Sequence, residues 1–361
     1  MIPHSRPFID DEDCHAVLDV LRSGQLVQGA AVAAFEEAFC REIDFHGAVN
    51  MDSEEVVLRS HAVAVSSGTA ALHLTLLALG VGTGDEVIIP SYVCTALWHA
   101  VRYAGATPVL ADIEGEAFNL SAHDVLPRLT KKTKAIILPH MFGQAADIDE
   151  LLKLGIPVIE DCAQSLGSLY RGQPTGTLGV AAIFSFYATK VIAAGEGGMI
   201  VSRDGNLIDR IRDMRDYDEK DTLATSFNYK LTDLQAALGI SQLKKLPTFI
   251  ARRQDIARHY DHVLRETGLT PPVEKPDRDH SYFRYVFLLD GTDCFFDDMN
   301  RQGVICRRPV FRPLHDYLGL SGFEVTNHIW QRAISVPIYP GLTNEEVETV
   351  CSTMNKLLPK I

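Results

Sequence analysis

The sequence of 361 residues lacks several features that mark specialised proteins. Its seven cysteines are scattered and form no CxxC pair, which argues against a disulfide framework or a zinc site and favours a reducing compartment. No apolar run approaches the length of a membrane span, and residues 1–13 are acidic and lack the apolar core of a signal peptide. We therefore expect a soluble cytoplasmic protein with no membrane partner and no metal.

Positive charge is also in short supply. The chain has 34 Lys and Arg residues against 47 Asp and Glu residues, which gives a formal net charge of −13. The phosphate backbone of a nucleic acid would repel such a protein, so we expect no nucleic-acid partner. A small phosphorylated ligand remains possible, because backbone dipoles at a helix N-terminus bind phosphate whatever the net charge is.

The hydrophobic pattern indicates an α/β fold. Several short runs rich in isoleucine and valine end in polar or turn residues, as strands buried on both faces do. These runs are residues 85–91, 107–113, 134–140, 156–163, 181–186 and 198–202. Helical patterns at 69–80, 95–105 and 148–155 separate most of them. This alternation predicts a mostly parallel central sheet covered by helices.

The pattern changes after about residue 230. Residues 231–266 predict one long amphipathic helix, 281–291 an exposed-sheet strand, and 344–358 a closing helix. We predict a large domain at 1–243 and a smaller C-terminal α+β domain at 244–361. The polar, weakly patterned segment 41–61 predicts a surface excursion.

Ligands of open α/β sheets bind outside the carboxyl ends of the strands, and one candidate there is the turn "SSGTAAL", residues 66–72. Its backbone N–H groups would open a helix, and Gly68 would allow a ligand to approach closely, so the turn predicts an anion site. The alternative is an ordinary helix N-cap by Ser67 or Thr69.

Three further side chains fall at predicted strand ends. Asp161 lies in "EDCAQS", Ser185 lies in "FSF", and Lys190 precedes the glycine-rich "GEGG". Taken singly, Asp161 could cap a helix, Ser185 could be a satisfied buried hydroxyl, and Lys190 could be a solvated charge. Taken together, they favour pyridoxal 5'-phosphate (PLP), which needs an amine for its aldehyde, a carboxylate for its pyridine nitrogen and an anion site for its phosphate.

The chain resembles the DegT/DnrJ/EryC1/StrS family of PLP-dependent nucleotide-sugar aminotransferases nearly end to end. The resemblance lies in ordered blocks at 22–39, 62–93, 138–151, 158–168, 185–200 and 228–243. It implies PLP-dependent transferase fold type I, which is the aspartate aminotransferase-like fold. It also implies an obligate homodimer with shared active sites.

The resemblance also implies residue roles. Lys190 matches the lysine of the internal aldimine, Asp161 the partner of the pyridine nitrogen, and Gln164 the amide at the ring hydroxyl. Asn228 matches an asparagine that reaches the phosphate from the neighbouring subunit, and Lys230 lies where a basic residue faces the shared site. The phosphate ligands by position are Gly68, Thr69 and Ser185.

Two departures from the family pattern concern the ring and the sugar. Cys94 holds the place where many relatives carry an aromatic stacked on the cofactor ring; Tyr92 or Trp98 could substitute, although we favour Trp98 as helix core. The loop 214–230 and the segment 307–315, which ends at His315, differ from relatives. We expect these two segments to shape the sugar pocket.

The implied reaction is amino transfer from L-glutamate to a nucleotide-linked keto sugar through PLP bound to Lys190. "GEGG" in place of "GDGG" favours a 4-keto sugar over a 3-keto sugar by family association. The alternatives are a sugar dehydratase, which carries histidine at the lysine position, an amino-acid lyase, and a non-catalytic regulator that retained the fold.

Overall fold

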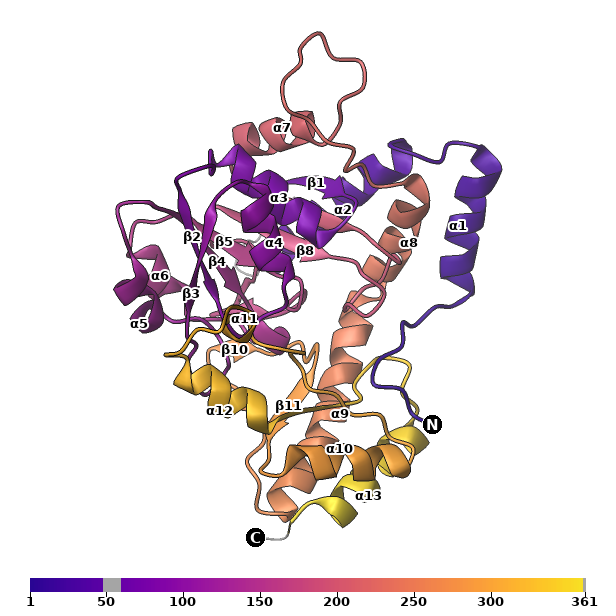
Figure 1. The fold of residues 1–361 in the computed structure, drawn as a ribbon. Helices are drawn as coiled ribbons and strands as arrows, with labels where there is room; N and C mark the ends of the chain where they lie inside the picture. Colours follow the sequence, from indigo (N-terminus) through magenta and orange to yellow (C-terminus); the bar gives the residue numbers. More distant parts are fainter. Residues whose placement is uncertain (48–59, 360–361) are drawn as a thin grey trace.

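A seven-stranded sheet forms the centre of the part of the chain that the structure, a computed structural model, describes: residues 1–47 and 60–359 (Figure 1). Its order is β1 (His61–Val65), β9 (Gly198–Ser202), β8 (Ala181–Ser185), β5 (Val158–Asp161), β4 (Thr133–Pro139), β2 (Glu86–Pro90) and β3 (Thr107–Ala111). Strand β9 runs antiparallel to both of its neighbours, and the other pairs are parallel. The predicted mostly parallel sheet is therefore confirmed.

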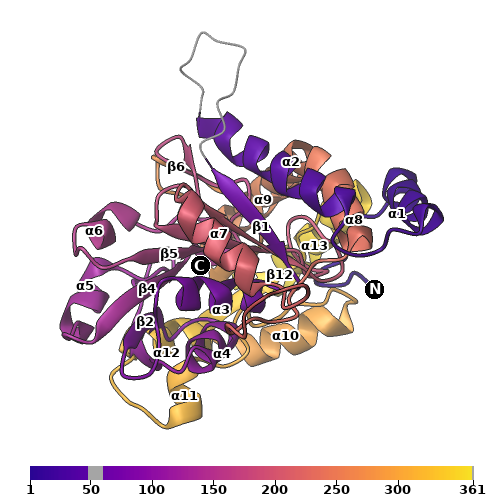
Figure 2. The same cartoon turned by 90° about the horizontal axis from the view of Figure 1, so that it is seen from above.

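Helices cover both faces of this sheet, because successive strand residues point to opposite sides (Figure 2). Val63 and Val65 pack into one core cluster with helices α3 (Gly68–Ala78), α4 (Ala96–Tyr103) and α7 (Gly205–Met214). Ala62 and Ala64 belong to a cluster on the opposite face. The helices of that face are α2 (Ala30–Gly47), α8 (Asp233–Lys244), α5 (Ala122–Val125) and α6 (Ile148–Leu152), and α1 (Asp11–Ser23) packs on α8.

The single long helix predicted for residues 231–266 is wrong. The structure has two helices there, α8 and α9 (Leu246–Glu266), which meet at Lys245. Pro247 lies in the first turn of α9. Proline has no backbone N–H and clashes with a preceding helical turn, so it is tolerated at a helix start and not in a helix interior.

The C-terminal elements surround a second core cluster, below the main sheet in Figure 1. They comprise the antiparallel pair β11 (Tyr285–Leu288) and β12 (Ala333–Val336), with helices α9, α10 (Thr292–Arg301) and α13 (Asn344–Leu357). Helices α11 (Leu314–Leu318) and α12 (Glu324–Arg332) instead pack into the first core cluster, through Leu314 and Ile329. Strand β11 is mostly buried, so the prediction of an exposed-sheet strand is wrong. The start of the chain joins this region, because Ile2 bridges to Val304. The division at residue 243 stays a prediction.

The remaining elements are short. They are the small sheet of β6 (Leu169–Tyr170), β7 (Gln173–Pro174) and β10 (Arg278–Asp279), and the 3-10 turns Leu126–Arg128 and Met141–Gly143. The predicted excursion at 41–61 lies mostly outside the described residues, and its first residues complete α2. No helix among the described residues is long and apolar enough to cross a bilayer.

Candidate active site

One edge of the central sheet gathers the polar groups that the sequence singles out. Asp161 ends β5 and Ser185 ends β8 at the carboxyl edge of the parallel strands. Because β9 is antiparallel, its first residue, Gly198, pairs with Ser185 at the same edge. The connecting loop 186–197 therefore starts and finishes there and brings Lys190 to the strand ends that carry Asp161 and Ser185.

The turn before α3 offers unpaired backbone donors. Ser67 is the N-cap, and its hydroxyl accepts a hydrogen bond of 3.1 Å from the Ala70 N–H, so the N-cap interpretation is confirmed for Ser67. Among the described residues, the N–H groups of Gly68 and Thr69 make no hydrogen bond. A Cβ on Gly68 would lie 3.0 Å from Ser185 Cβ, so glycine allows this turn to pack closely on β8. Capping and anion binding are thus compatible at one helix start.

The loop that carries Lys190 is held by its own backbone. Phe186 N–H donates to Gly197, Ala194 N–H donates to Phe186, and Lys190 N–H donates to Tyr187, at 2.8–2.9 Å. Gly197 has a φ of 148°, which a side chain would disfavour. These hydrogen bonds fix the backbone of the turn. None of them involves the Lys190 side chain.

The Lys190 ammonium is partly buried and lies 5.1 Å from the ring centroid of Phe283. Its Nζ makes no hydrogen bond or ion pair within the described ranges. Burial lowers the pKa of Lys190; Cys94 and Asp161 oppose this shift, and the positive charge of Arg284 adds to it. A lysine with a lowered pKa holds a larger neutral fraction, which is the form that acts as nucleophile and base.

Asp161 is a buried carboxylate without a cationic partner. It is 7% exposed, and its Oδ1 accepts a hydrogen bond of 3.0 Å from the Ala163 N–H. It caps a turn and not a helix, because no helix follows β5 directly. Burial raises the pKa of Asp161, and the Ala163 N–H, Lys190 and His140 oppose the rise. In the described part of the chain, no lysine, arginine or histidine forms an ion pair with it.

These groups fit PLP. A cationic pyridine nitrogen would supply the charge that the Asp161 carboxylate lacks, and the free N–H groups at the start of α3, together with Ser185, suit a phosphate. Lys190 supplies the amine from the adjacent loop. The donor set is the set that this cofactor requires.

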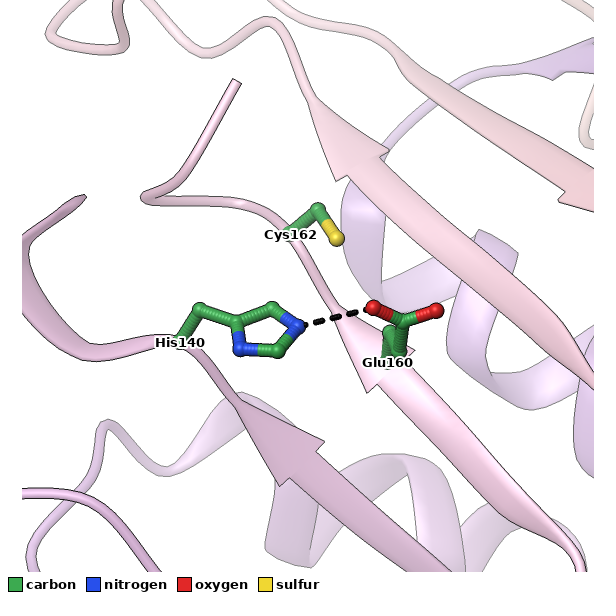
Figure 3. Close-up of side chains that lie close together, drawn as sticks. All are labelled: His140, Glu160 and Cys162. Carbon is green, nitrogen blue, oxygen red and sulfur yellow. Dashed lines mark hydrogen bonds and ion pairs between the residues drawn. The ribbon is translucent and has the colours of Figure 1, made fainter. Parts of the chain in front are cut away.

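A buried hydrogen-bond network is built on Glu160, the residue that precedes Asp161 in β5 (Figure 3). His140 Nδ1 accepts from the Ala146 N–H at 3.0 Å, so its proton lies on Nε2, which donates to Glu160 at 2.9 Å. Glu160 also accepts from three backbone N–H groups, those of Gly176, Leu178 and Gly179. Although His140, Glu160 and Cys162 could each offer a metal ligand atom, these bonds already use the histidine and the carboxylate. We interpret the cluster as a structural support for the end of β5.

The residues expected near the cofactor ring occupy different environments. Gln164 Oε1 accepts from the Phe142 N–H at 3.0 Å. Cys94 is partly open to solvent, yet desolvation raises the pKa of its thiol, and Asp161 adds to the rise while Lys190 opposes it. Trp98 packs against the core of α3 and α4, as expected. Tyr92 is fully buried, and its hydroxyl has no hydrogen-bond partner among the described residues.

The segment that contains Asn228 and Lys230 lies beside the turn before α3. Ser66 N–H donates to the Tyr229 carbonyl at 2.8 Å, and Val65 bridges to Lys230. Asn228 is exposed. Lys230 Nζ pairs with Asp216 and Asp218, at 2.6 and 3.0 Å, from the preceding loop.

His315 is buried, and both of its ring nitrogens are hydrogen-bonded. Nδ1 lies 2.7 Å from the Ser91 hydroxyl, and Nε2 lies 3.1 Å from Asn327 Oδ1. The bonds with Ser91 tie α11 to the end of β2, and the contact with Asn327 ties it to α12. A contact of His315 with substrate would require one of them to break, and its substrate role stays a prediction.

Sequence reasoning missed Phe283 and Arg284. Both side chains lie near Lys190, since its ammonium is over the Phe283 ring and the Arg284 charge lowers its pKa. The available signal was an arginine inside the otherwise apolar run 281–289. The pattern of that run predicts an exposed-sheet strand, in which an arginine needs no explanation.

Comparison with known proteins identifies the family of the chain. The model of the DegT/DnrJ/EryC1/StrS aminotransferase family matches residues 7–355. A GDP-perosamine synthase of Vibrio cholerae is 33% identical over 98% of this chain and 98% of its own length. The aminotransferase TlmJ from Streptoalloteichus hindustanus superposes with a TM-score of 0.90 at 30% identity, covering 99% of this chain and 98% of its own. Spr1654 of Streptococcus pneumoniae, in its PLP form, has a TM-score of 0.88 at 26% identity, covering 98% and 97% of the two chains.

Proposed function

Because this chain belongs to the DegT/DnrJ/EryC1/StrS aminotransferase family, we propose that it moves an amino group from L-glutamate to the 4-keto group of a GDP-linked sugar. The chain is a PLP-dependent aminotransferase of nucleotide-linked sugars. The donor, the nucleotide and the position of the keto group are our proposal. The observation that supports amino transfer through PLP is that Lys190, Asp161 and the start of α3 meet at one edge of the sheet.

We assign the following residues to the cofactor. Lys190 would bind its aldehyde carbon and Asp161 its pyridine nitrogen. Gln164 would contact the ring hydroxyl and Cys94 would lie at the ring. The phosphate ligands would be Gly68, Thr69 and Ser185 of this chain and Asn228 of a partner chain. When bound, PLP supplies an aldehyde that condenses with amines and a ring that withdraws electrons from the substrate carbon.

Lys190 has two tasks in the proposed reaction. Its Nζ would hold the cofactor. Once free, it would take a proton from the donor carbon that bears the amine in one half of the reaction and deliver a proton to the sugar carbon in the other half. The lowered pKa of Lys190 favours the neutral amine that this transfer requires. Asp161 would remain ionised beside the cationic ring and would keep the pyridine nitrogen protonated throughout both halves of the reaction.

The relatives support the choice of acceptor. GDP-perosamine synthases from three bacteria match this chain at 32–35% identity, and their name specifies a GDP-linked amino sugar. A 4-keto acceptor agrees with the "GEGG" sequence after Lys190. The 3-keto sugar is the second candidate, and a direct comparison of the two acceptors separates them.

We also propose a homodimer with shared active sites. Asn228 is exposed in one chain although the backbone beside it is fixed to the turn before α3. An exposed amide at that place can reach across an interface into the site of a second copy. Lys230 would face the same shared site after release from Asp216 and Asp218. The seven free cysteines agree with action in the cytoplasm.

Borohydride reduction followed by peptide mass spectrometry tests the proposal. We expect one cofactor adduct on Lys190. Incubation with L-glutamate before the reduction should abolish this adduct and release 2-oxoglutarate. An amino-acid lyase would form the same adduct but would release other products from its substrate, and a non-catalytic regulator would release no 2-oxoglutarate. An adduct on another lysine would refute the assignment of Lys190.

A further inference from the structure

A guanidinium group without a carboxylate partner lies beside the site lysine. Arg284 immediately precedes β11 and is partly buried. Its Nη1 lies 3.2 and 3.3 Å from the two ring nitrogens of His4. Within the described ranges, no aspartate or glutamate lies close enough to form an ion pair with Arg284, and its Nε and Nη2 atoms make no hydrogen bond. The charge is therefore uncompensated.

The surroundings of Arg284 make this arrangement costly. Burial lowers the pKa of Arg284 to about 10, and Tyr92 opposes the shift. Burial, Arg284 and Arg307 together lower the pKa of His4 to about 3, so His4 is neutral and offers no charge to the guanidinium. A buried cation is ordinarily retained only where it is paired or where a ligand pairs with it.

Arg284 and Lys190 share one aromatic ring. The Arg284 Cζ lies 5.3 Å and the Lys190 Nζ 5.1 Å from the centroid of Phe283. The two cations also influence each other, because the charge of Arg284 lowers the pKa of Lys190. A small anion bound to Arg284 would therefore lie near the amine that exchanges with the substrate.

A second polar group without a partner lies near Arg284. The hydroxyl of Tyr92 is fully buried and has no hydrogen-bond partner among the described residues. The Tyr92 ring contacts Phe142, whose carbonyl accepts a hydrogen bond of 3.2 Å from the Arg284 backbone N–H. The Tyr92 ring lies 6.4 Å from Phe118 and 6.3 Å from Phe142. Those two phenylalanines and Arg284 line a narrow cleft that is partly open to solvent, and Tyr92 lies behind its phenylalanine wall. Glu116 also lines it but forms no ion pair with Arg284.

We propose that Arg284 binds a carboxylate of the amino donor, and of the keto acid that leaves, with the Tyr92 hydroxyl as a second donor. This inference rests on the proposed function and adds a substrate-binding residue to it. A planar guanidinium holds a carboxylate through two parallel hydrogen bonds. The bound anion would also satisfy the charge that the protein leaves unpaired. A phosphate of the nucleotide is the alternative anion, and separate measurement of the two half-reactions distinguishes it.

The test uses the PLP-loaded enzyme with Arg284→Met and Arg284→Lys. We expect Arg284→Met to lower kcat/KM for the L-glutamate half-reaction about 100-fold, mainly through KM, with Arg284→Lys intermediate. The keto-sugar half-reaction should change by less than about twofold. As a readout independent of turnover, 2-oxoglutarate should raise the Tm of the loaded wild-type enzyme and not that of Arg284→Met. The control is Arg301→Met, which replaces an exposed arginine that pairs with Asp298. This variant should behave as wild type.

Two outcomes overturn the inference. Equal losses in both half-reactions would make Arg284 a structural residue, and a loss confined to the sugar half would assign it to the nucleotide phosphate. Failure of the proposed function has a different signature, because the wild-type enzyme would then show no cofactor adduct on Lys190. A normal adduct together with an unchanged L-glutamate half-reaction in Arg284→Met refutes only the role of Arg284.

Discussion

The backbone N–H of Ser66 donates a hydrogen bond of 2.8 Å to the carbonyl of Tyr229. This bond fixes the segment with Asn228 beside the turn that begins α3, although 163 positions separate Ser66 and Tyr229 in the sequence. Asn228 itself is exposed. The two sites of the proposed dimer would therefore lie close to the interface and would each receive a residue from both chains.

Subunit mixing tests this arrangement. Lys190→Ala and Asn228→Ala should each be strongly impaired alone, but a mixed dimer would contain one site with both residues intact. Random mixing should restore about a quarter of the wild-type sites, measured as transamination rate after refolding together. The control mixes Lys190→Ala with Asp161→Asn, whose residues belong to one chain, and should restore nothing. Equal results for the two mixtures would show that Asn228 acts within its own chain.

Substitution of Asp161 tests the role of the buried carboxylate. Asp161→Asn keeps the size of the side chain and removes the charge that would hold the pyridine nitrogen protonated. We expect kcat for transamination to fall about 100-fold or more. The free energy of unfolding, measured separately, shows whether the substitution also changes protein stability. The control is Asp209→Asn, which removes an exposed carboxylate that pairs with Arg212. Wild-type kcat in Asp161→Asn would mean that another group keeps the ring protonated.

Substitution of Cys94 tests what lies against the cofactor ring. If the thiol holds the place of an aromatic, Cys94→Phe should stack on the ring and lower the PLP dissociation constant about threefold to tenfold. Cys94→Ala should leave it nearly unchanged. Equilibrium dialysis measures both values. Weaker PLP binding by Cys94→Phe would show that the position has no room for a second ring.

The pair of His140 and Glu160 predicts a pH dependence of stability. Burial alone would raise the pKa of Glu160, but the hydrogen bond from His140 and the backbone N–H groups outweigh it and lower the pKa below 4.5. The stabilisation is therefore complete above pH 4.5 and is lost as the pH falls through the lowered value. Glu160→Gln should cost about 3 kcal/mol of unfolding free energy at pH 7, because it leaves a buried network incomplete.

Urea unfolding at several pH values measures this effect. The difference between wild type and Glu160→Gln should shrink as the pH falls below 4.5. Glu150→Gln, in an exposed pair with Lys153, provides the matched control and should cost less than about 1 kcal/mol. A difference that stays constant down to low pH would contradict the lowered pKa of Glu160.

The sequence was sufficient for the sheet and for the residues at its edge. Buried parallel strands such as β4 and β5 have apolar centres, so the polar residues at their ends stand out, and Asp161 is the last residue of β5. The break at Lys245 could have been predicted from Pro247. These features depend on neighbours in the sequence, which is why pattern reasoning reaches them.

Contacts between distant segments were beyond such reasoning. The approach of Phe283 to Lys190 depends on how the C-terminal elements pack on the sheet, and nothing local in either segment encodes it. The pairing of Lys230 with Asp216 and Asp218 likewise depends on the path of a loop. The unpaired charge of Arg284 became visible only when every neighbouring side chain was in place.

The most direct test of the account follows the nitrogen atom. L-glutamate labelled with ¹⁵N is incubated with the PLP-loaded enzyme and a GDP-linked 4-keto sugar, and the sugar product is analysed by mass spectrometry. We predict a labelled GDP-linked amino sugar with one equivalent of 2-oxoglutarate, and no product from Lys190→Ala. An unlabelled product, or a labelled product of equal amount from Lys190→Ala, would contradict amino transfer through this lysine.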